Sequence, residues 1–286
     1  MKKLTIGWLY PELMSTYGDR GNIICLKRRC EWRGIDVEIR NLDVGFSEKE
    51  LIGCDLLFMG GAQDRQQKIV GEDLAKKRNA LKEMIEDYTP GVYICGAYQF
   101  LGRYYKEADG SIVEGLGILD LYTEHPGFDK PRLIGNIVVT TNVILSEAKD
   151  LSRMRVSNEL RDSSASGLRM TRGETLVGFE NHGGRTYLGK EVKPLGKVLR
   201  GFGNNGKDGT EGVVYKNSFG SYFHGPILPK NPKLADLLIK LALEKKYLPA
   251  NATHKALQAG KKTTLKELDD SLENKAHEAI LKRLNI

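Results

Sequence analysis

Short apolar runs alternate with amphipathic stretches through the first hundred residues of the chain. The apolar runs, in order, are LTIGWLY (4–10), DVEIRNL (36–42), DLLFMGG (55–61) and VYIC (92–95). Stretches with helical spacing lie between them, from about 22 to 33 and near 71–88. Strands that alternate with helices predict a parallel sheet covered by helices on both faces. Because ligands bind such sheets at the carboxyl ends of the strands, we expect the functional residues at that edge.

From about 112 to 223 the pattern changes to short strands separated by glycine-rich turns. The candidate strands, in order, are ILDLYT, LIGNIVVTT, TLVGFEN, TYLG, KVLRGFG, GVVYK and FGSYFHG. They predict an antiparallel extension or a curled second sheet beside the parallel one. Residues 232–246 then have apolar side chains at helical spacing, and a linker leads to a last, mostly polar helix at about 264–284. We therefore expect one domain over 1–248, followed by a linker and helical tail over 249–286.

One segment interrupts the order of strands. Residues 143–173 are rich in Arg, Ser and charged side chains and have little sustained apolar period. Such a composition buries too little apolar surface to offset the entropy of ordering. We interpret 143–173 as a mobile insertion that loops out of the domain.

Composition excludes several classes of protein. The formal charge of +7 is spread over many lysines without a dense basic arm or an aromatic RNA-binding motif, so nucleic-acid binding is not expected. Cys25, Cys30, Cys54 and Cys95 form no CxxC pair, which predicts free thiols and no metal site. The apolar runs are too short to cross a bilayer, and the first residues lack a long apolar signal region. A cytosolic protein is expected.

Cys95 lies where an apolar strand meets the start of a helix, GAYQFLG. Such an elbow exposes the side chain to the helix N-terminus, which favours a reactive thiolate. The alternative is a small buried side chain at a strand end, the commoner role of a cysteine. Gly61 follows the preceding strand and, with Gly96, could supply the amides of an oxyanion hole. His224 ends another strand and is a candidate base for the thiol.

The sequence resembles the class I, or triad-type, glutamine amidotransferases, in their cobyric-acid-synthase-like branch. The segments that carry this resemblance are YGDRGNI (17–23), MGGAQDRQQ (59–67), CGAYQFLG (95–102), GLGILDLYTE (115–124), RLIGNI (132–137), GFENHGGRTYLG (178–189), GFGNNGKDGTEG (201–212) and YFHGPILPKNP (222–232). The resemblance implies a three-layer α/β/α, flavodoxin-like class I glutaminase fold with an antiparallel extension.

The same resemblance implies roles for single residues. Cys95 would form a thioester with the glutamine side chain, His224 would shuttle the proton, and the amides of Gly61 and Gly96 would hold the oxyanion. Gln99 and Arg132 would contact glutamine. The planar guanidinium of Arg132 can pair with an α-carboxylate through two parallel hydrogen bonds, although a solvated surface arginine is the alternative.

The sequence departs from the family pattern near both reactive residues. Tyr93 and Ala97 replace the glycines that commonly flank the nucleophile, and Pro226 stands two residues after His224, where glutamate is usual. The third member of the triad therefore comes from elsewhere in the chain, is missing, or is donated by a partner. His182, in FENHGG, is the alternative base.

The expected function is that of an ammonia-supplying subunit. The chain has no GxxxxGK[ST] phosphate loop with which to activate an acid, so a synthetase partner is needed. The resemblance implies a Mur-ligase-like partner (MurT) that carries ATP and Mg²⁺, with lipid II as acceptor and no cofactor in this chain. The alternatives are the glutaminase of another cobyric-acid-synthase-like enzyme, a Cys–His peptidase of the same fold, or a non-catalytic scaffold.

Overall fold

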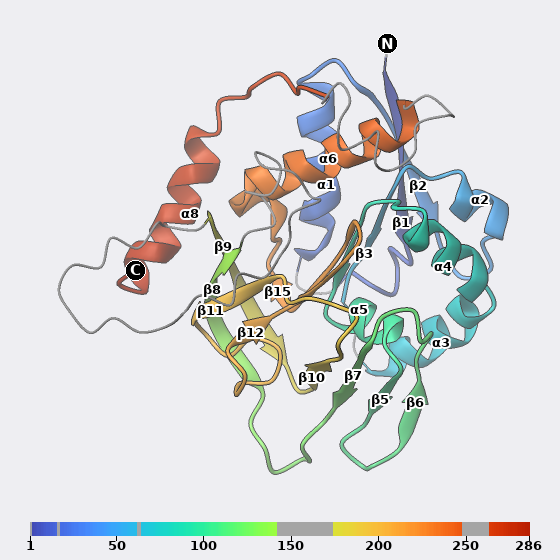
Figure 1. The fold of residues 1–286 in the computed structure, drawn as a ribbon, viewed down its shortest axis with the longest axis vertical. Coiled ribbons are helices and arrows are strands. Elements are labelled where there is room, and N and C mark those ends of the chain that lie inside the picture. Colours follow the sequence, from blue (N-terminus) through green and yellow to red (C-terminus); the bar gives the residue numbers. More distant parts are fainter. Residues whose placement is uncertain (1, 16–17, 62–63, 142–173, 248–262) are drawn as a thin grey trace.

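The computed structural model describes residues 2–15, 18–61, 64–141, 174–247 and 263–286 (Figure 1). A six-stranded central sheet has the order β13-β14-β4-β3-β1-β2. Its strands are β1 (Lys3–Leu9), β2 (Asp36–Leu42), β3 (Leu56–Met59), β4 (Gly91–Ile94), β13 (Val213–Tyr215) and β14 (Ser218–Ser221). All neighbours are parallel except β13, which is antiparallel to β14. The parallel sheet predicted from the first hundred residues is confirmed.

Helices cover both faces of this sheet. The helices are α1 (Arg20–Glu31), α2 (Glu48–Ile52), α3 (Asp64–Ala75), α4 (Arg78–Glu86), α5 (Gly96–Leu101) and α6 (Pro232–Tyr247). In β3, Leu57 and Met59 pack in a cluster with side chains of α2 to α5, whereas Leu56 and Phe58 pack with α1 and α6. Because neighbouring residues of a strand point to opposite faces, the sheet needs two apolar layers, and the predicted three-layer α/β/α architecture results.

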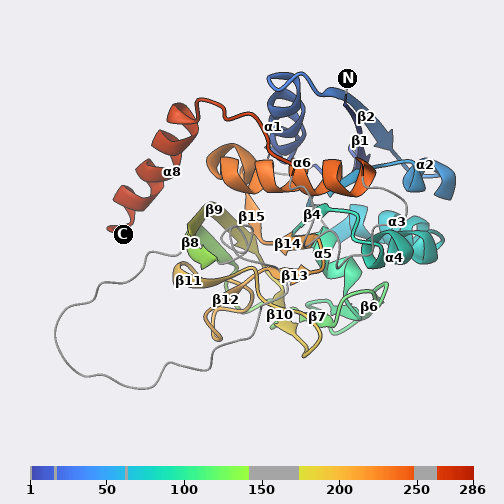
Figure 2. The ribbon, with the colours of Figure 1, turned by 45° about the horizontal axis from the view of Figure 1, so that its top comes forward.

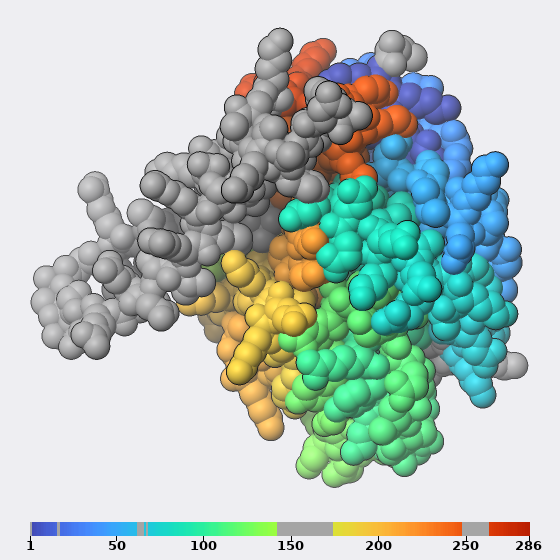
Figure 3. All heavy atoms as spheres, turned by 45° about the vertical axis from the view of Figure 1, so that its right-hand side comes forward, coloured from blue at the N-terminus to red at the C-terminus, as the bar shows by residue number. Residues whose placement is uncertain are grey.

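The remaining strands form two smaller sheets. One, in the order β10-β7-β5-β6, and the other, in the order β12-β11-β8-β9-β15, are antiparallel except for the β5–β7 pair. Their strands are β5 (Tyr104–Lys106), β6 (Ile112–Glu114), β7 (Leu121–Glu124), β8 (Leu133–Thr141), β9 (Glu174–His182), β10 (Arg185–Leu188), β11 (Gly196–Arg200), β12 (Thr210–Glu211) and β15 (Phe223–His224). The predicted antiparallel extension is thus present as two sheets, and Figure 3 shows β5 to β7 (green) as a lobe beneath α3 and α4.

The strand predicted at 219–225 is divided between two sheets. Its first part, β14, lies beside β4 in the central sheet, and its second part, β15, pairs with β9. The chain changes sheets at Tyr222. This transfer joins the parallel core to the five-stranded sheet and brings residues of both to one edge.

The helix predicted near 71–88 is two helices, α3 and α4. They are separated at Lys76 and Lys77, whose amides donate to the carbonyls of Asp73 and Leu74 three residues back. The Lys77 ammonium is buried and lies 2.5 Å from Asp73 Oδ1. An ion pair at this tight turn holds the chain where a single helix would have continued.

The C-terminal tail differs from the predicted helix at 264–284, because α8 begins later, at Ser271, and ends at Arg283. The residues before it are extended against α1, where the buried Arg29 guanidinium pairs with both Asp236 and Asp270. α8 itself has no buried residue and is held by polar contacts such as His277 Nε2 to Thr175 Oγ1 at 2.8 Å. Figure 2 shows α8 at the margin of the molecule, consistent with its polar composition.

Two predicted segments lie outside the described residues. These are the insertion at 143–173 and the first part of the linker, to 262. In the ranges that the structure describes, no helix combines the length and the apolar composition that crossing a membrane requires.

Candidate active site

Cys95 lies at the turn between β4 and α5. Its backbone has φ 52° and ψ −114°, a conformation that costs a residue with a side chain strain energy. Its amide donates to the carbonyl of Ser221 at 2.8 Å, which ties the turn to β14. The side chain is half-buried, while Gly96 and Ala97 behind it are buried. The structure therefore has a strained strand-to-helix elbow at the predicted position.

His224 reaches the same edge from the other sheet. Ser221, the last residue of β14, pairs with Ile94 directly before the thiol. The chain then turns into β15, where His224 pairs with Phe179 of β9. The imidazole is 1% exposed and interacts with the Cys95 thiol.

Gly61 lies where these two residues meet. A Cβ atom at this position would be 2.9 Å from His224 Cε1 and 3.2 Å from Cys95 Cβ. Only glycine leaves room for the imidazole to approach the thiol here. Three of the predicted residues are therefore brought together at the carboxyl edge of the central sheet, and Gly96, the first residue of α5, adjoins them.

Asp19 completes the cluster, and sequence reasoning assigned it no role. It follows β1 in the loop that leads to α1, and its side chain is fully buried. Oδ2 accepts a hydrogen bond from the Gly61 amide at 2.7 Å, and Oδ1 lies 3.7 Å from His224 Nδ1. The available signal was its place in YGDRGNI, a segment that carries the family resemblance and follows the first strand.

The Gly61 contact bears on the predicted oxyanion hole. The amide that was expected to hold the oxyanion donates to Asp19 in this structure. A role for Gly61 in holding the oxyanion therefore stays a prediction, and it requires this hydrogen bond to be shared or released. Gly96 belongs to the first turn of α5, where amides have no partner within the helix.

The electrostatic surroundings favour a charged imidazole at His224. Burial lowers the pKa of this histidine, but the contacts and charges of Asp19 and Cys95 outweigh burial and raise the pKa to about 10. A histidine that holds a proton between a carboxylate and a thiol is suited to form a thiolate–imidazolium pair. The chemistry that this arrangement can perform is nucleophilic attack by sulfur.

Arg132 precedes β8 and is exposed. Its Nε and Nη2 donate to Oδ1 and the carbonyl oxygen of Asn181, both at 2.9 Å. Asn181 and Phe179 lie on the same face of β9, and Phe179 pairs with His224. The guanidinium is thus held on the His224 face of the sheet, about 6.7 Å along the strand from the residue opposite the imidazole. Its Nη1 takes no part in these two bonds and can contact a carboxylate.

Gln99, on α5, is buried beside the elbow. Its Nε2 donates to the hydroxyl of Tyr222 at 2.8 Å, and that hydroxyl also shares a hydrogen bond of 2.7 Å with Thr186. One hydrogen of the Gln99 amide is therefore used within the protein. The predicted contact with glutamine would have to use the second hydrogen on Nε2 or the oxygen Oε1 of the Gln99 side chain.

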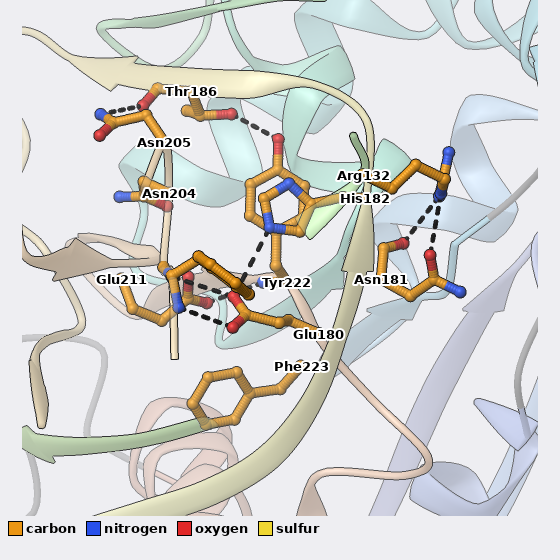
Figure 4. A network of polar contacts seen from close by, with 12 residues as sticks. Arg132, Glu180, Asn181, His182, Thr186, Asn204, Asn205, Glu211, Tyr222 and Phe223 are labelled. Atoms are coloured by element: carbon orange, nitrogen blue, oxygen red, sulfur yellow. Dashed lines mark hydrogen bonds and ion pairs between the residues drawn. The ribbon is translucent and has the colours of Figure 1, made fainter. Parts of the chain in front are cut away.

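His182, the alternative base, belongs to a separate buried network (Figure 4). Its ring stacks on Tyr222 with centroids 3.5 Å apart, and Nδ1 is 2.8 Å from the carbonyl of Gly184. Nε2 lies 3.7 Å from Glu180. Burial lowers the pKa of His182, so the ring is neutral. The structure places this histidine against Tyr222 and Glu180, as a packed member of the sheet.

Two buried carboxylates flank this network. Glu180 accepts the amides of Phe202 and Gly203, and Glu211 accepts the Ser221 hydroxyl and the Tyr222 amide. Burial raises the pKa of Glu211 to about 7. In the part of the chain that the structure describes, no three His, Cys, Asp or Glu side chains are grouped so that they could hold a metal ion.

An α/β sheet that presents a cysteine on a strained elbow, beside a histidine and a buried carboxylate, has the arrangement of a triad-type cysteine hydrolase. Residues 5–232 match the CobB/CobQ-like glutamine amidotransferase domain, and the chain belongs to this family. The predicted class I glutaminase fold and the predicted enzyme class are thereby confirmed.

Relatives of established description agree with this family. The chain is 38% identical over 289 residues to the lipid II isoglutaminyl synthase (glutamine-hydrolyzing) subunit GatD of Staphylococcus aureus strain N315, covering 100% of this chain and 98% of the relative. It is 42% identical over 247 residues to the subunit of the same name from Streptococcus pneumoniae, covering 86% and 82%. A probable cobyric acid synthase of Methanothermobacter thermautotrophicus is 33% identical over 198 residues, 66% of this chain and 33% of that one.

Proposed function

We propose that this chain is a glutaminase subunit that hydrolyses L-glutamine to glutamate and ammonia, and that the ammonia passes to a Mur-ligase-like (MurT) subunit. That partner would amidate the D-glutamate α-carboxylate of lipid II to D-isoglutamine during peptidoglycan synthesis. The observation that carries the first part is the meeting of Cys95, His224 and Asp19 at one edge of the sheet. The second part rests on the similarity, over most of both chains, to two lipid II isoglutaminyl synthase subunits.

The first chemical step is attack of the Cys95 thiolate on the side-chain carboxamide carbon of glutamine. His224, whose contacts with Asp19 and Cys95 raise the pKa of the imidazole to about 10, takes the thiol proton as the sulfur attacks. The carbonyl π electrons move to oxygen and form a tetrahedral oxyanion. Backbone amides directed at that oxygen stabilise it, and the amide of Gly96, the residue after Cys95, is a candidate donor.

The second step releases ammonia. His224 returns its proton to the carboxamide nitrogen, the carbon–nitrogen bond breaks, and a thioester remains on Cys95. The same imidazole then removes a proton from water, which attacks the thioester and frees glutamate. One histidine serves as acid and then as base, so its position relative to the sulfur must be held throughout.

Glutamine would bind on the face of β9 that lies beside His224. Arg132 is anchored by two hydrogen bonds to Asn181 and keeps Nη1 for the α-carboxylate of glutamine. Gln99, fixed through Tyr222, borders the elbow on the other side. These positions suit a free amino acid held at one end while its side chain reaches the thiol.

The partner supplies what this chain lacks. Activating a carboxylate for amidation requires ATP and Mg²⁺, which we assign to the Mur-ligase-like subunit, and no cofactor is assigned to this chain. Because lipid II is a membrane lipid, the complex would act in the cytoplasm at the inner membrane surface.

Glutamate release from L-glutamine by the chain co-purified with its Mur-ligase-like partner tests the proposal. The parent should turn over glutamine, and Cys95→Ala should show none while keeping its thermal unfolding midpoint. Cys25→Ala is the matched control, because Cys25 is the other half-buried thiol and lies in α1 away from the elbow. Turnover in Cys95→Ala, or its loss in Cys25→Ala, would contradict the assignment.

A further inference from the structure

A short segment connects the backbone beside Cys95 to His224. The Ser221 carbonyl accepts the amide of Cys95 at 2.8 Å, and residues 222 and 223 lead from there to His224. We call residues 221–223 the transfer segment, because the chain passes in them from the central sheet to β15. The conformation of this segment therefore sets where the imidazole lies relative to the thiol.

We propose that Glu211, in β12, is a positioning residue that holds the transfer segment and thereby keeps His224 at Cys95. The inference rests on the proposed glutaminase function, in which His224 moves the proton at the sulfur. Glu211 acts through the backbone. The side chains that chiefly shift the pKa of the imidazole are Asp19 and Cys95 instead.

The transfer segment leaves the ladder of one sheet before it joins the next, so its amides need other acceptors. Oε1 of Glu211 accepts the Tyr222 amide and the Ser221 hydroxyl, each at 2.8 Å. The Ser221 oxygen in turn accepts the Phe223 amide at 3.0 Å. One carboxylate oxygen thus binds the segment directly and through a hydroxyl, and its loss would leave buried backbone donors unpaired.

Glu211 is itself fixed close to β14. Oδ1 of the buried Asn204 accepts the amide of Gly212, the residue after Glu211, at 2.9 Å, and its Nδ2 donates to the Gly212 carbonyl at 3.0 Å. Gly212 has φ 64°, and a Cβ atom there would lie 2.4 Å from the carbonyl oxygen of Gly220 in β14. Glycine therefore lets the end of β12 approach the strand that the transfer segment leaves, and Asn204 holds it there.

The Glu211 carboxylate costs the fold stability. Burial, together with the charge of Glu180 from β9, raises the pKa of Glu211 from 4.5 to about 7, and Glu211 also acts on Tyr98 of α5. Since the unfolded chain loses this proton at lower pH, ionised Glu211 lowers stability as pH rises from 4.5 through 7. A buried acid that destabilises the fold while it binds the segment before His224 indicates a functional role.

Alkylation of Cys95 by iodoacetamide reports whether His224 is in place, because the reagent attacks the thiolate. The rate is followed by mass spectrometry of the peptide that contains Cys95. In Glu211→Ala the rate at pH 7 should fall about tenfold, whereas at pH 10, where a thiol ionises without a histidine, it should change by less than about twofold. A folded Glu211→Ala variant with the parent rate at pH 7, or with equal changes at both pH values, would overturn the inference.

Glu211→Gln separates hydrogen bonding from charge. The amide oxygen of glutamine can accept the same two donors, so the alkylation rate at pH 7 should return to within about twofold of the parent rate. A glutamine variant as slow as Glu211→Ala would overturn the inference, because these hydrogen bonds would then not be what positions His224.

Glu180→Ala is the matched control. Glu180 is equally buried and also binds two donors, the amides of Phe202 and Gly203, which lie outside the transfer segment. Its backbone pairing with Phe223 does not depend on the side chain. This variant should lose stability as Glu211→Ala does, yet keep the alkylation rate at pH 7 within about twofold of the parent rate. An equal fall in Glu180→Ala would make the effect a general one of losing a buried carboxylate, and would overturn the inference.

Ser221→Ala decides the question if Glu211→Ala does not fold. It removes the hydroxyl that links the Phe223 amide to Glu211 and keeps the bond from the Tyr222 amide. The alkylation rate should fall about threefold at pH 7 and stay unchanged at pH 10. A parent rate at pH 7 in this variant would then overturn the inference.

Glutamine hydrolysis by the complex with the Mur-ligase-like partner separates this inference from the proposed function, because alkylation needs neither glutamine nor the partner. The kcat of Glu211→Ala should fall about 10- to 100-fold, since misplacing a catalytic group by about 1 Å has an effect of this size. If the parent shows the alkylation differences but hydrolyses no glutamine, the glutaminase assignment fails and the role of Glu211 stands. If the parent hydrolyses glutamine and Glu211→Ala has the parent kcat, the inference fails and the proposed function stands.

Discussion

His224 and His182 are two buried histidines at the same distance from a carboxylate, yet their charges differ. Nδ1 of His224 lies 3.7 Å from Asp19, and Nε2 of His182 lies 3.7 Å from Glu180. The pKa of His224 is raised to about 10, whereas the pKa of His182 is lowered. The distance to an acid therefore does not identify the base.

The acids differ in how many donors compete for them. Both oxygens of Glu180 accept backbone amides, from Phe202 at 2.7 Å and Gly203 at 2.9 Å. Asp19 accepts one amide, that of Gly61, on a single oxygen. The second oxygen of Asp19 remains available to His224, so Asp19 can orient the imidazole. Glu180 instead uses both oxygens to bind backbone amides.

The rings also differ in their other contacts. His182 is fixed by the Gly184 carbonyl and its ring stacks on the Tyr222 ring, and Cys95 is not among the groups that shift its pKa. His224 has Cys95 on its second side, and the thiol contributes to the raised pKa. His224 can carry a proton because it lies between Asp19 and Cys95, and both of these groups stabilise the positively charged imidazole.

Replacing each histidine by alanine should separate the two roles most strongly. His224→Ala should lower kcat by about 10²- to 10⁴-fold, because the proton carrier is lost. His182→Ala should lower kcat far less and instead lower the free energy of unfolding by about 2–4 kcal/mol through the lost ring packing. Glutamate release and urea unfolding measured on both variants check this, and the reverse order of kcat would show that His182 is the base.

Arg132→Ala should raise KM by about 10- to 100-fold with a smaller effect on kcat. The α-carboxylate contact acts on ground state and transition state alike, so its loss appears mainly in binding. Arg132→Lys should recover only part of the binding, because a point charge cannot reproduce the planar fork held by Asn181. A fall in kcat at constant KM would instead place Arg132 in the chemical step.

The pH dependence of stability should show the two histidines with opposite sign. The folded pKa of His224, about 10, exceeds its ordinary 6.5, so its contribution is complete below 6.5 and is lost as pH rises through 10. His182 is buried neutral, so stability falls as pH drops below 6.5, where the unfolded chain takes up a proton. Unfolding free energies of the parent minus each histidine-to-alanine variant should shrink toward high pH for His224 and toward low pH for His182.

Removing the insertion should have the smallest effect. The strands on either side are paired to their ends, with Thr141 opposite Glu174, so a short turn can join β8 to β9. Replacing residues 145–172 by a Gly-Ser bridge should leave the unfolding midpoint and kcat near those of the parent, because loop closure varies slowly with length. A loss of kcat at unchanged stability would make this segment part of the site or of the partner interface.

The position of Cys95, at the end of a strand of the parallel sheet, could be predicted from the sequence pattern. The approach of His224 and Asp19 to it could not. The run VYIC followed by a helix start located the Cys95 elbow, because strand and helix periods are local properties. His224 could be named a candidate base from its place at the end of a strand, but nothing local shows that 219–225 changes sheets and so reaches the thiol. Asp19 was missed because it is far from His224 in sequence, and only the fold brings it across to Gly61.

The transfer of the chain between sheets also orders events during synthesis. β4 and its elbow leave the ribosome early, but their neighbour β14, and His224 after it, come only once the strands from β5 to β13 have been made. Domains generally begin to fold from the N-terminus as they emerge. The nascent chain therefore carries Cys95 without its proton carrier while residues 96–223 are being made. The molecule acquires its nucleophilic activity only after β14 and His224 have been made and have joined the elbow.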